Sequence, residues 1–471
     1  MPSKPSTEIV PEMLQQDFGD SPEDIEAART RSDQIDAELS SEGAARARKR
    51  REENHVLLLG QSGAGKSTLN KQFQLLCTPE SMDQERSAWR GVIFANIVRS
   101  IREIFEALGV HDPQSQRGPG SDGGFSDNTG VAAMVPPPVN TNLMNLRHRL
   151  GPLLSMENEI AKSLKANYIN DYNTGEEHMA VRQGWQDVAN ESETASGEYQ
   201  DEDDVLGDVS RILYQFKQDI RSLWALPDTQ QLIKKRKFQP SEAAHAFLRD
   251  LDRIAEPEWL PSDDDILYAR LRTAGMETKL FEIPGTRNNK RKLWRIADVG
   301  GSMSQRQAWI PFFEDTDAII FLAPISSFDQ FLQEDPTRNR IEDSLKLFQS
   351  IVNQPLLKSA HIILLLNKTD VLKQKLQSGI KVSKYIPTYG DSPNTPEAVT
   401  AYFKQAFIGE FELACEKLQQ TQRGGSPNRS LTVFTSSVVD TSTTRQLIHN
   451  IVKKLNEDMM SRAFVGVSHR A

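Results

Sequence analysis

The sequence predicts an α/β fold in which helices cover both faces of a mainly parallel sheet, with a long helical segment inserted into that sheet. Five short apolar runs, each typical of a buried strand, lie at residues 55–59, 292–297, 318–323, 361–366 and 431–434. Helical patterns separate the later runs, and apolar strands that alternate with helices predict a parallel sheet. From about residue 79 to about residue 262 the apolar pattern is helical.

The predicted domains follow from this order. The sheet domain combines residues 54–78 with residues 265–471, and residues 79–264 form an inserted all-α domain. Within the insert, a stretch rich in Gly, Pro, Ser and Asp at 111–140 and an acidic stretch at 173–207 predict two flexible insertions.

Residues 1–53 precede the first strand and are predicted to be a disordered start followed by a helix. The first 20 residues are polar, and Ser21-Pro22-Glu23-Asp24 favours a helix start. This segment ends in a basic cluster at residues 46–51. The cluster suits a localisation or membrane-surface signal, and it also suits the solvated last turns of a helix, where positive charge complements the helix dipole; we favour the second interpretation.

The composition excludes several classes of protein. With 56 basic and 65 acidic residues the formal net charge is −9, which argues against a general nucleic-acid-binding protein. The two cysteines, Cys77 and Cys415, are too few for a disulfide framework and indicate a reducing, intracellular compartment. No apolar run approaches the length of a membrane span. We therefore expect a cytoplasmic protein without nucleic-acid partners.

The most specific motif is a phosphate-binding loop of the form G-x-x-x-x-G-K-S at residues 60–67. It lies between an apolar strand and a helical pattern, which is the setting that such a loop requires. Glycines let successive backbone N–H groups turn toward phosphate oxygens, and the helix N-terminus adds positive potential. Lys66 is expected to reach the β- and γ-phosphates, and the Ser67 hydroxyl is expected to bind Mg²⁺. The predicted nucleotide ligands here are Gly60, Gly63, Ala64, Gly65, Lys66, Ser67 and Thr68.

A second motif, Asp298-Val299-Gly300-Gly301, follows the strand predicted at 292–297. An Asp at this place can hold Mg²⁺ through a water molecule, and a flexible Gly-Gly can bring the N–H of Gly301 to the γ-phosphate. The pattern is short, so its meaning depends on the phosphate loop upstream.

A third motif, Asn367-Lys368-Thr369-Asp370, identifies the base. The Asp370 carboxylate can accept from the ring N1–H and the exocyclic amine of guanine, which adenine does not offer in that pattern, while the Lys368 stem packs over the ring. Ser437, after the last predicted strand, can present a backbone N–H to the guanine carbonyl. These residues predict GTP or GDP as the ligand and disfavour an ATP-using kinase or ATPase.

With these motifs the chain resembles the α subunits of heterotrimeric G proteins over about residues 21–460, apart from the two insertions. Further likeness lies in residues 87–90, 247–254, 264–275 and 309–314. The family fold is a Ras-like P-loop GTPase domain with an inserted helical domain, and the nucleotide lies between the two. The resemblance therefore implies a Mg²⁺-dependent GTPase that acts as a GTP/GDP switch.

The resemblance also implies residue roles. Arg270 is the family's built-in arginine finger, and in such enzymes an arginine finger contributes about 10³–10⁵ to the rate. Thr273 is the switch-one ligand of Mg²⁺, and Leu267 belongs to the same nucleotide-binding segment.

The second switch should change with the nucleotide. By resemblance, Arg306 pairs with Asp343 when GTP is bound, and Trp309 enters the groove beside the following helix. The alternative is that Trp309 is a constant core residue.

The chain departs from the family where hydrolysis is controlled. The family has a catalytic Gln directly after the Gly-Gly of the second switch, and this chain has Ser302 there, followed by Met303 in place of Arg. A Ser hydroxyl is too short both to accept from the water and to donate to the γ-phosphate. In the phosphate loop Ser62 replaces Gly and Gly63 replaces Glu, which removes a partner of Arg270. GTP binding is therefore predicted, with slow hydrolysis.

The two ends bear on partners. The family binds a βγ dimer through its N-terminal helix and second switch, and it couples to G protein-coupled receptors and effectors. Here the start Met1-Pro2-Ser3 cannot be myristoylated, and residues 464–471 lack the Cys-Gly-Leu-type ending presented to receptors. The resemblance implies a βγ partner and action at the inner face of the plasma membrane, by peripheral association without N-myristoylation.

Two interpretations remain for the function. The first is a slow GTPase switch of the Gα type. The second is a hydrolysis-deficient protein that stays loaded with GTP and acts as an interaction or scaffold protein, which Ser62 and Ser302 favour.

Overall fold

The computed structural model describes residues 53–110, 141–170, 177–181, 184–186, 205–273, 275–284, 291–332, 335–421 and 429–468, and the single helical residues Arg31 and Ala37. The chain divides into two units, residues 1–54 and residues 55–471. Most of the predicted N-terminal segment, the whole predicted insertion at 111–140 and most of that at 173–207 lie outside the described residues, so these three predictions stay predictions.

Six strands form the main sheet, in the order β5-β6-β1-β7-β8-β9. They are β1 (Glu53–Leu59), β5 (Met276–Pro284), β6 (Arg291–Val299), β7 (Ala318–Pro324), β8 (His361–Asn367) and β9 (Leu431–Thr435). The pairs β1–β7, β7–β8 and β8–β9 are parallel, and β5 pairs antiparallel with β6. The prediction of a mainly parallel sheet is confirmed, and each of the five apolar runs lies in one of these strands.

Strand β5 is the one that a search for continuous apolar runs missed. Its sequence, METKLFEIP, mixes charged and apolar residues. Phe281 and Ile283 are buried, whereas Leu280 before them is 47% exposed and Glu282 between them is exposed. A strand at the edge of a sheet with one wet face alternates in this way, so it lacks the continuous hydrophobicity of the central strands.

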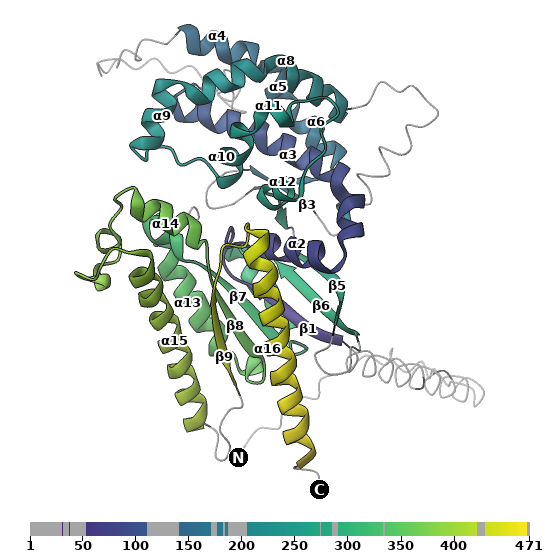
Figure 1. The fold of residues 1–471 in the computed structure, drawn as a ribbon, viewed down its shortest axis with the longest axis vertical. Helices are drawn as coiled ribbons and strands as arrows, with labels where there is room; N and C mark the ends of the chain where they lie inside the picture. Colours follow the sequence, from purple (N-terminus) through teal and green to yellow (C-terminus); the bar gives the residue numbers. More distant parts are fainter. Residues whose placement is uncertain are drawn as a thin grey trace, which may run out of the picture. The chain divides into compact units, whose positions relative to one another are not determined.

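Helices cover both faces of the sheet, as Figure 1 shows. Because successive strand residues point to opposite faces, Leu57 and Phe321 join one buried cluster, while Leu58 and Ile320 join another. The first cluster includes residues of α13 (Arg340–Val352), α14 (Thr369–Gln377) and α15 (Pro396–Thr421), and the second includes residues of α2 (Lys66–Cys77) and α16 (Thr441–Ser468).

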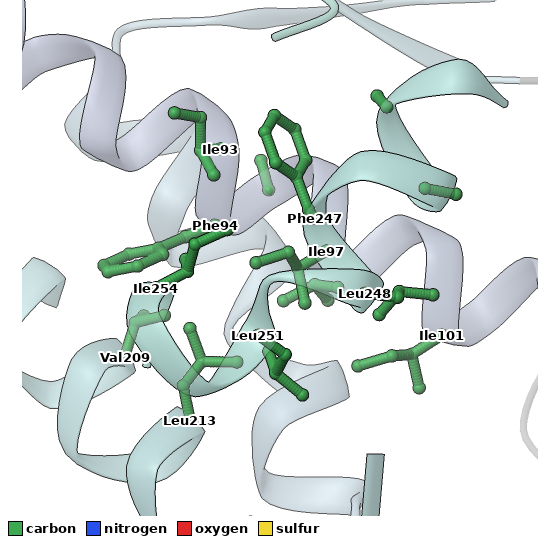
Figure 2. Packing of buried hydrophobic residues seen from close by; sticks show 14 of the residues in the cluster. Ile93, Phe94, Ile97, Ile101, Val209, Leu213, Phe247, Leu248, Leu251 and Ile254 are labelled. Atoms are coloured by element: carbon green, nitrogen blue, oxygen red, sulfur yellow. The ribbon is translucent and has the colours of Figure 1, made fainter. Parts of the chain in front are cut away.

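The segment between α2 and β4 (Arg272–Thr273) is mainly helical and has its own core. Figure 2 shows Ile93, Phe94, Ile97 and Ile101 on one stripe of the long helix α3, packed against residues of the later helices. The spacing of these apolar residues is the helical period on which the prediction rested. The helices are α3 (Pro79–Ala107), α4 (Thr141–Arg149), α5 (Gly151–Ser155), α6 (Glu157–Ser163), α8 (Val205–Ala225), α9 (Pro227–Lys234), α10 (Glu242–Arg249), α11 (Leu251–Ile254) and α12 (Asp263–Tyr268).

This helical segment also carries two strands that the sequence did not predict. Strand β2 (Asn167–Asn170) pairs antiparallel with β3 (Glu177–Val181), and β3 pairs parallel with β4. The resulting three-stranded sheet, β2-β3-β4, joins the inserted segment to the chain that follows Arg270. Strands of two to five residues are too short to give a recognisable period of two in the sequence.

The remaining elements are 3₁₀ helices. They are η2 (Met303–Phe312), η3 (Ile325–Asp329), η4 (Pro355–Leu357), η5 (Val382–Lys384) and η6 (Pro387–Tyr389). No helix in the described part of the chain combines the length and the apolar character needed to cross a membrane. The parallel strands β1, β8 and β9 end at one edge of the sheet, and a predicted nucleotide motif follows each of them. The fold thus brings those motifs together.

Candidate functional site

The phosphate loop has a backbone that only glycine tolerates at two of its positions. Gly60 has φ 142° and Gly65 has φ 105°. A Cβ on Gly60 would lie 2.5 Å from the carbonyl oxygen of Leu322, and one on Gly65 would lie 2.4 Å from Nδ2 of Asn367. The loop therefore packs directly against the ends of β7 and β8. This close packing fixes the course of the loop before α2 begins at Lys66.

Lys66 spans the loop. Its ammonium group donates to the carbonyl oxygens of Gly60 and Gln61, at 2.8 and 2.9 Å. The side chain is buried, and burial lowers the pKa of Lys66 to about 8, although Asp298 opposes this shift. A buried cation beside the backbone of a glycine-rich loop suits the negative charge of a polyphosphate.

Ser67 and Asp298 form the candidate metal site. The Ser67 hydroxyl donates to Oδ2 of Asp298 at 2.5 Å, and Asp298 is completely buried. Burial raises the pKa of Asp298 to about 6, against the attraction of Lys66. Its other oxygen, Oδ1, has no hydrogen-bond partner in the described part of the chain. A hydroxyl beside a carboxylate oxygen that needs a partner fits Mg²⁺, which takes few protein oxygens and keeps its waters. The side chain of Thr273, the third predicted ligand, lies outside the described atoms.

The Gly300-Gly301 turn lies against the phosphate loop, as the motif predicts. The N–H of Ser62 donates to the carbonyl of Gly301 at 3.1 Å. A Cβ on Gly301 would lie 2.4 Å from Nζ of Lys66. The start of the second switch therefore touches the group that is expected to bind the terminal phosphates.

Asn367 connects the base motif with the phosphate loop. Its Nδ2 donates to the carbonyl of Ala64 at 2.8 Å. Its Oδ1 accepts from the Ser436 hydroxyl at 3.1 Å and from the N–H of Val438 at 3.2 Å. Asn367 is completely buried. Three segments far apart in the sequence are thus held by one carboxamide.

Two of the other predicted base-reading groups make no hydrogen bond within the described part of the chain. Neither the Asp370 carboxylate nor the N–H of Ser437 makes a hydrogen bond with any described residue. Lys368 has a left-handed backbone, with φ 64°, and its ammonium group donates to Glu242 of α10 at 2.7 Å. Burial lowers the pKa of Lys368, and Glu242 opposes this shift. The Asp370 carboxylate and the Ser437 N–H therefore remain available as the acceptor and the donor that the motif requires for guanine.

The segment that carries Arg270 is held at its backbone. Asn96 of α3 accepts from the Arg270 N–H at 2.7 Å and donates to the Arg270 carbonyl at 2.8 Å. Lys71 of α2 donates to the carbonyls of Ile266 and Ala269, at 2.8 and 2.9 Å. Leu267, between them, is buried. Both ends of the segment are thus fixed, and the Arg270 side chain is exposed.

Arg270 points to the place where the family has a Glu. Its Nη2 lies 3.7 Å from the position of a Cβ on Gly63, and Nη2 of Arg340 lies 3.5 Å from the same position. Arg340, at the start of α13, also donates to the carbonyl of Ser62 at 2.7 Å. Two guanidinium groups therefore approach the loop where this chain has no carboxylate.

The second switch is docked on α13. Arg306 donates to Asp343 at 2.7 Å, and Arg338 donates to the same carboxylate at 3.2 Å. Gln61 of the phosphate loop donates to it as well, at 2.5 Å. Burial alone would raise the pKa of Asp343, but the bonds from Arg306 and its neighbours outweigh burial and hold that pKa below its ordinary value. The predicted Arg306–Asp343 pair is present.

Trp309 is buried, a position that fits both interpretations given for it. It is 3% exposed, and its Nε1 donates to the carbonyl of Gly300 at 2.9 Å. Ser302, the residue at the position of the catalytic Gln, lies seven residues earlier and bonds only with its own switch: its hydroxyl donates to Gln305 at 3.0 Å and lies 3.3 Å from the Ser304 hydroxyl.

Sequence reasoning missed several residues that hold this site. Gln61 was treated as a variable loop position, and only the structure shows that its side chain is 1% exposed and has a specific partner. Asn96 interrupts the apolar stripe of α3, which marks it in the sequence, whereas nothing in the local pattern marks Lys71. The partners, in α13, in α12 and directly after it, are more than 150 residues away and cannot be found from local pattern.

Comparison with known proteins gives one consistent result. The family model for the G-protein alpha subunit matches residues 29–455. The guanine nucleotide-binding protein alpha-4 subunit of Mycosarcoma maydis is 29% identical, over 87% of this chain and 83% of its own length. The alpha-17 subunit of Caenorhabditis briggsae is 30% identical over 82% and 87%, and the alpha-15 subunit of Oryctolagus cuniculus is 26% identical over 91% and 92%. The chain therefore belongs to the G protein alpha-subunit family, the guanine nucleotide-binding signal transducers and GTPases that work with Mg²⁺ and with βγ and receptor partners.

Proposed function

We propose that this chain is a GTP/GDP switch that hydrolyses GTP slowly. The observation that carries the proposal is Ser302, which stands where the family has its catalytic Gln and whose hydroxyl is bonded to Gln305 within the same switch. A side chain of two heavy atoms is too short both to accept from the attacking water and to donate to the γ-phosphate, so Ser302 alone is a poor substitute for Gln.

Each residue around the proposed nucleotide has a role in binding either the phosphates or the base. Lys66 and the N–H groups of the phosphate loop bind the phosphates, and Gly301 approaches the terminal one. Asp370 and the N–H of Ser437 read the guanine edge, with Lys368 over the ring. Their lack of hydrogen bonds to the described residues supports this assignment for Asp370 and Ser437.

The metal would be held by Ser67 and, through water, by Asp298, with Thr273 as the switch-one ligand. When bound, Mg²⁺ supplies positive charge between the β- and γ-phosphates. Support comes from the Ser67–Asp298 hydrogen bond and from the buried Asp298 oxygen without a described partner.

Hydrolysis adds water across the β–γ anhydride. The water oxygen bonds to the γ-phosphorus while the bond to the bridging oxygen breaks, GDP leaves with that oxygen, and the water proton ends on the released phosphate. Arg270 would neutralise charge that develops on the γ-phosphoryl group, since Asn96 fixes its backbone beside the loop. Arg270 can act without Ser302, so turnover is slowed and not abolished.

A second function is a GTP-loaded interaction protein. The specific observation that favours it is the Arg306–Asp343 pair, to which Gln61 and Arg338 add two further hydrogen bonds. An extended network on one buried carboxylate favours the docked form of the second switch. If turnover is also slow, the docked form persists.

Partners follow from the family. We propose a βγ dimer as the partner of the second switch, whose Ile310 is 49% exposed. A groove between η2 and α13, lined by Trp309, Phe313, Leu347 and Ile351, is the corresponding place for an effector. Receptor coupling is proposed at the level of the family.

Single-turnover hydrolysis of preloaded GTP separates the two functions. A slow switch should release phosphate at a measurable rate that is well below about 10⁻² s⁻¹, the value for a Gα with its arginine in place. No release over many hours would favour the scaffold, and release at the ordinary rate would contradict both.

A further inference from the structure

Gln305 occupies a position against the Gly300-Gly301 turn that the family resemblance does not explain. A Cβ on Gly300 would lie 1.9 Å from Gln305 Oε1, 2.5 Å from its Cδ and 3.0 Å from its Nε2. The carboxamide therefore lies flat on the backbone of Gly300, in space that only a glycine leaves open. A solvated surface glutamine would have no reason to adopt this position.

The hydrogen bond between Ser302 and Gln305 has a defined direction. Oε1 carries no hydrogen, so the Ser302 hydroxyl must donate to it, at 3.0 Å. The lone pairs of the Ser302 oxygen stay available, one of them facing the Ser304 hydroxyl at 3.3 Å. Nε2 of Gln305 donates to no residue in the described part of the chain. The Ser302–Gln305 pair thus offers the Ser302 oxygen as an acceptor and Gln305 Nε2 as a donor.

This pair is close to the expected position of the terminal phosphate. Gly301 touches Lys66 and accepts from the N–H of Ser62. Ser302 follows directly, and the Gln305 carboxamide covers Gly300, the residue before Gly301. The N–H of Gly300 donates to the carbonyl of Gly275 at 3.0 Å, before β5, and the Gly301 end of the turn faces Gln61, Ser62 and Lys66 of the phosphate loop.

We propose that Ser302 and Gln305 together replace the missing catalytic Gln. The Ser302 oxygen accepts a hydrogen bond from the attacking water, and Gln305 Nε2 donates to an oxygen of the γ-phosphate. Oε1 of Gln305 orients the Ser302 hydroxyl by accepting a hydrogen bond from it. This inference rests on the proposed GTP hydrolysis, and it makes Gln305 a catalytic residue. No proton is transferred to either side chain.

Two variants at position 305 test the proposal. Gln305→Glu keeps the acceptor for Ser302 and removes the donor, while Gln305→Ala removes both. Gln307→Ala, an exposed glutamine on the same 3₁₀ helix, is the control. We expect both position-305 variants to lower the single-turnover rate about tenfold to a hundredfold, as loss of a hydrogen bond to a charged group does. Affinity for a non-hydrolysable GTP analogue should stay within about twofold of wild type in Gln305→Ala, whereas the carboxylate of Gln305→Glu should weaken it by repelling the γ-phosphate.

A second readout does not depend on turnover. GDP with aluminium fluoride mimics the phosphoryl group in flight, so its affinity should fall in both variants, while affinity for GDP alone should not. In a Ser302→Gln background, Gln305→Ala should change little, because one side chain then does both tasks.

The outcomes separate this proposal from slow hydrolysis itself. Unchanged hydrolysis and aluminium fluoride binding in Gln305→Ala and Gln305→Glu overturn the role of Gln305, whatever the wild-type rate. If Gln305→Ala loses affinity for the GTP analogue by as large a factor as it loses rate, the role of Gln305 is also overturned, since that result marks a structural residue. An ordinary wild-type rate that Gln305→Ala lowers contradicts slow hydrolysis and supports the role of Gln305.

Discussion

The two ends of the nucleotide site differ in how they are built. At the base end, the buried Asn367 joins the phosphate loop, β8 and the turn after β9 through three hydrogen bonds. At the hydrolysis end, Ser62, Gly63 and Ser302 all depart from the family, and the Arg270 side chain is exposed. The predicted guanine-reading residues are thus part of the packed sheet edge, whereas the positions expected to control turnover are a few side chains that can change without loss of the fold.

The difference has a physical cause. A substitution of Asn367 would leave several buried polar groups without partners, each at a cost of about 1–3 kcal/mol. Ser302 directly precedes the partly exposed 3₁₀ helix η2, and its hydroxyl bonds only with near neighbours among the described residues, so replacing it costs the fold little. Substitutions at the base end are therefore expected to lower the stability of the fold, whereas a substitution of Ser302 at the hydrolysis end is expected to change only the rate of hydrolysis.

The largest expected effect is at Arg270. If the arginine finger still operates, Arg270→Ala should lower single-turnover hydrolysis about 10³-fold, while GTP affinity changes little because the side chain stays outside the packed core. Phosphate release from GTP-loaded protein measures the rate. A similar rate in the variant would show that the hydrolysis end has lost its main cation as well as its Gln.

The base end is tested next, at Asp370. Asp370→Asn should weaken GTP binding by about 1.5–3 kcal/mol, the value of a charge-assisted hydrogen bond, and should shift preference toward xanthine nucleotides. Competition binding with GTP, ATP and xanthosine triphosphate measures both effects. Asp391→Asn, an exposed carboxylate before α15, is the matched control. Unchanged GTP affinity in the Asp370 variant would refute the guanine assignment.

Ser67→Asn probes the boundary between the two ends. Because a metal held by Ser67 would neutralise charge on the terminal phosphate, which only GTP has, the variant should lose affinity for GTP about tenfold more than for GDP, the difference that one ligand to a charged group makes. Titrations of both nucleotides with and without Mg²⁺ give the comparison. Equal loss for GTP and GDP would mean that Ser67 has only a structural role beside Asp298.

The smallest effect is spectroscopic. If the second switch undocks with GDP, Trp309 should leave its contact with Gly300, and its fluorescence should differ between GDP and a non-hydrolysable GTP analogue. Trp309→Phe, which leaves the other five tryptophans, should abolish the difference. A signal that is identical in both states would assign Trp309 to the constant core.

Sequence reasoning succeeded where one segment contains the whole signal. The five apolar strands and the phosphate loop are confirmed in position, because continuous burial and a glycine-rich turn are local properties. The edge strand β5 was not predicted because it alternates and has no continuous apolar run. The short strands β2, β3 and β4 were not predicted because each is too short to show a period. Length and burial, more than residue type, decided which strands could be found.

The site shows the same limit. The Arg306–Asp343 pair was predicted through the family and is present. The contribution of Gln61 to that carboxylate and the contact of Gln305 with Gly300 were not predicted. Both glutamines stand at positions where a polar residue is unremarkable in one dimension, and only the packed backbone shows what each side chain touches.

Slow turnover caused by the substituted hydrolysis end is tested most directly by restoring that end. Single-turnover phosphate release should be measured for wild type, Ser302→Gln, Ser62→Gly and the double variant, with GTP affinity measured alongside. We predict that wild type lies well below about 10⁻² s⁻¹, that Ser302→Gln is faster, and that the double variant exceeds both single variants because both positions act on one water. A wild type that already hydrolyses at the ordinary rate, or a folded Ser302→Gln variant no faster than wild type, would contradict the claim that the substituted hydrolysis end slows turnover.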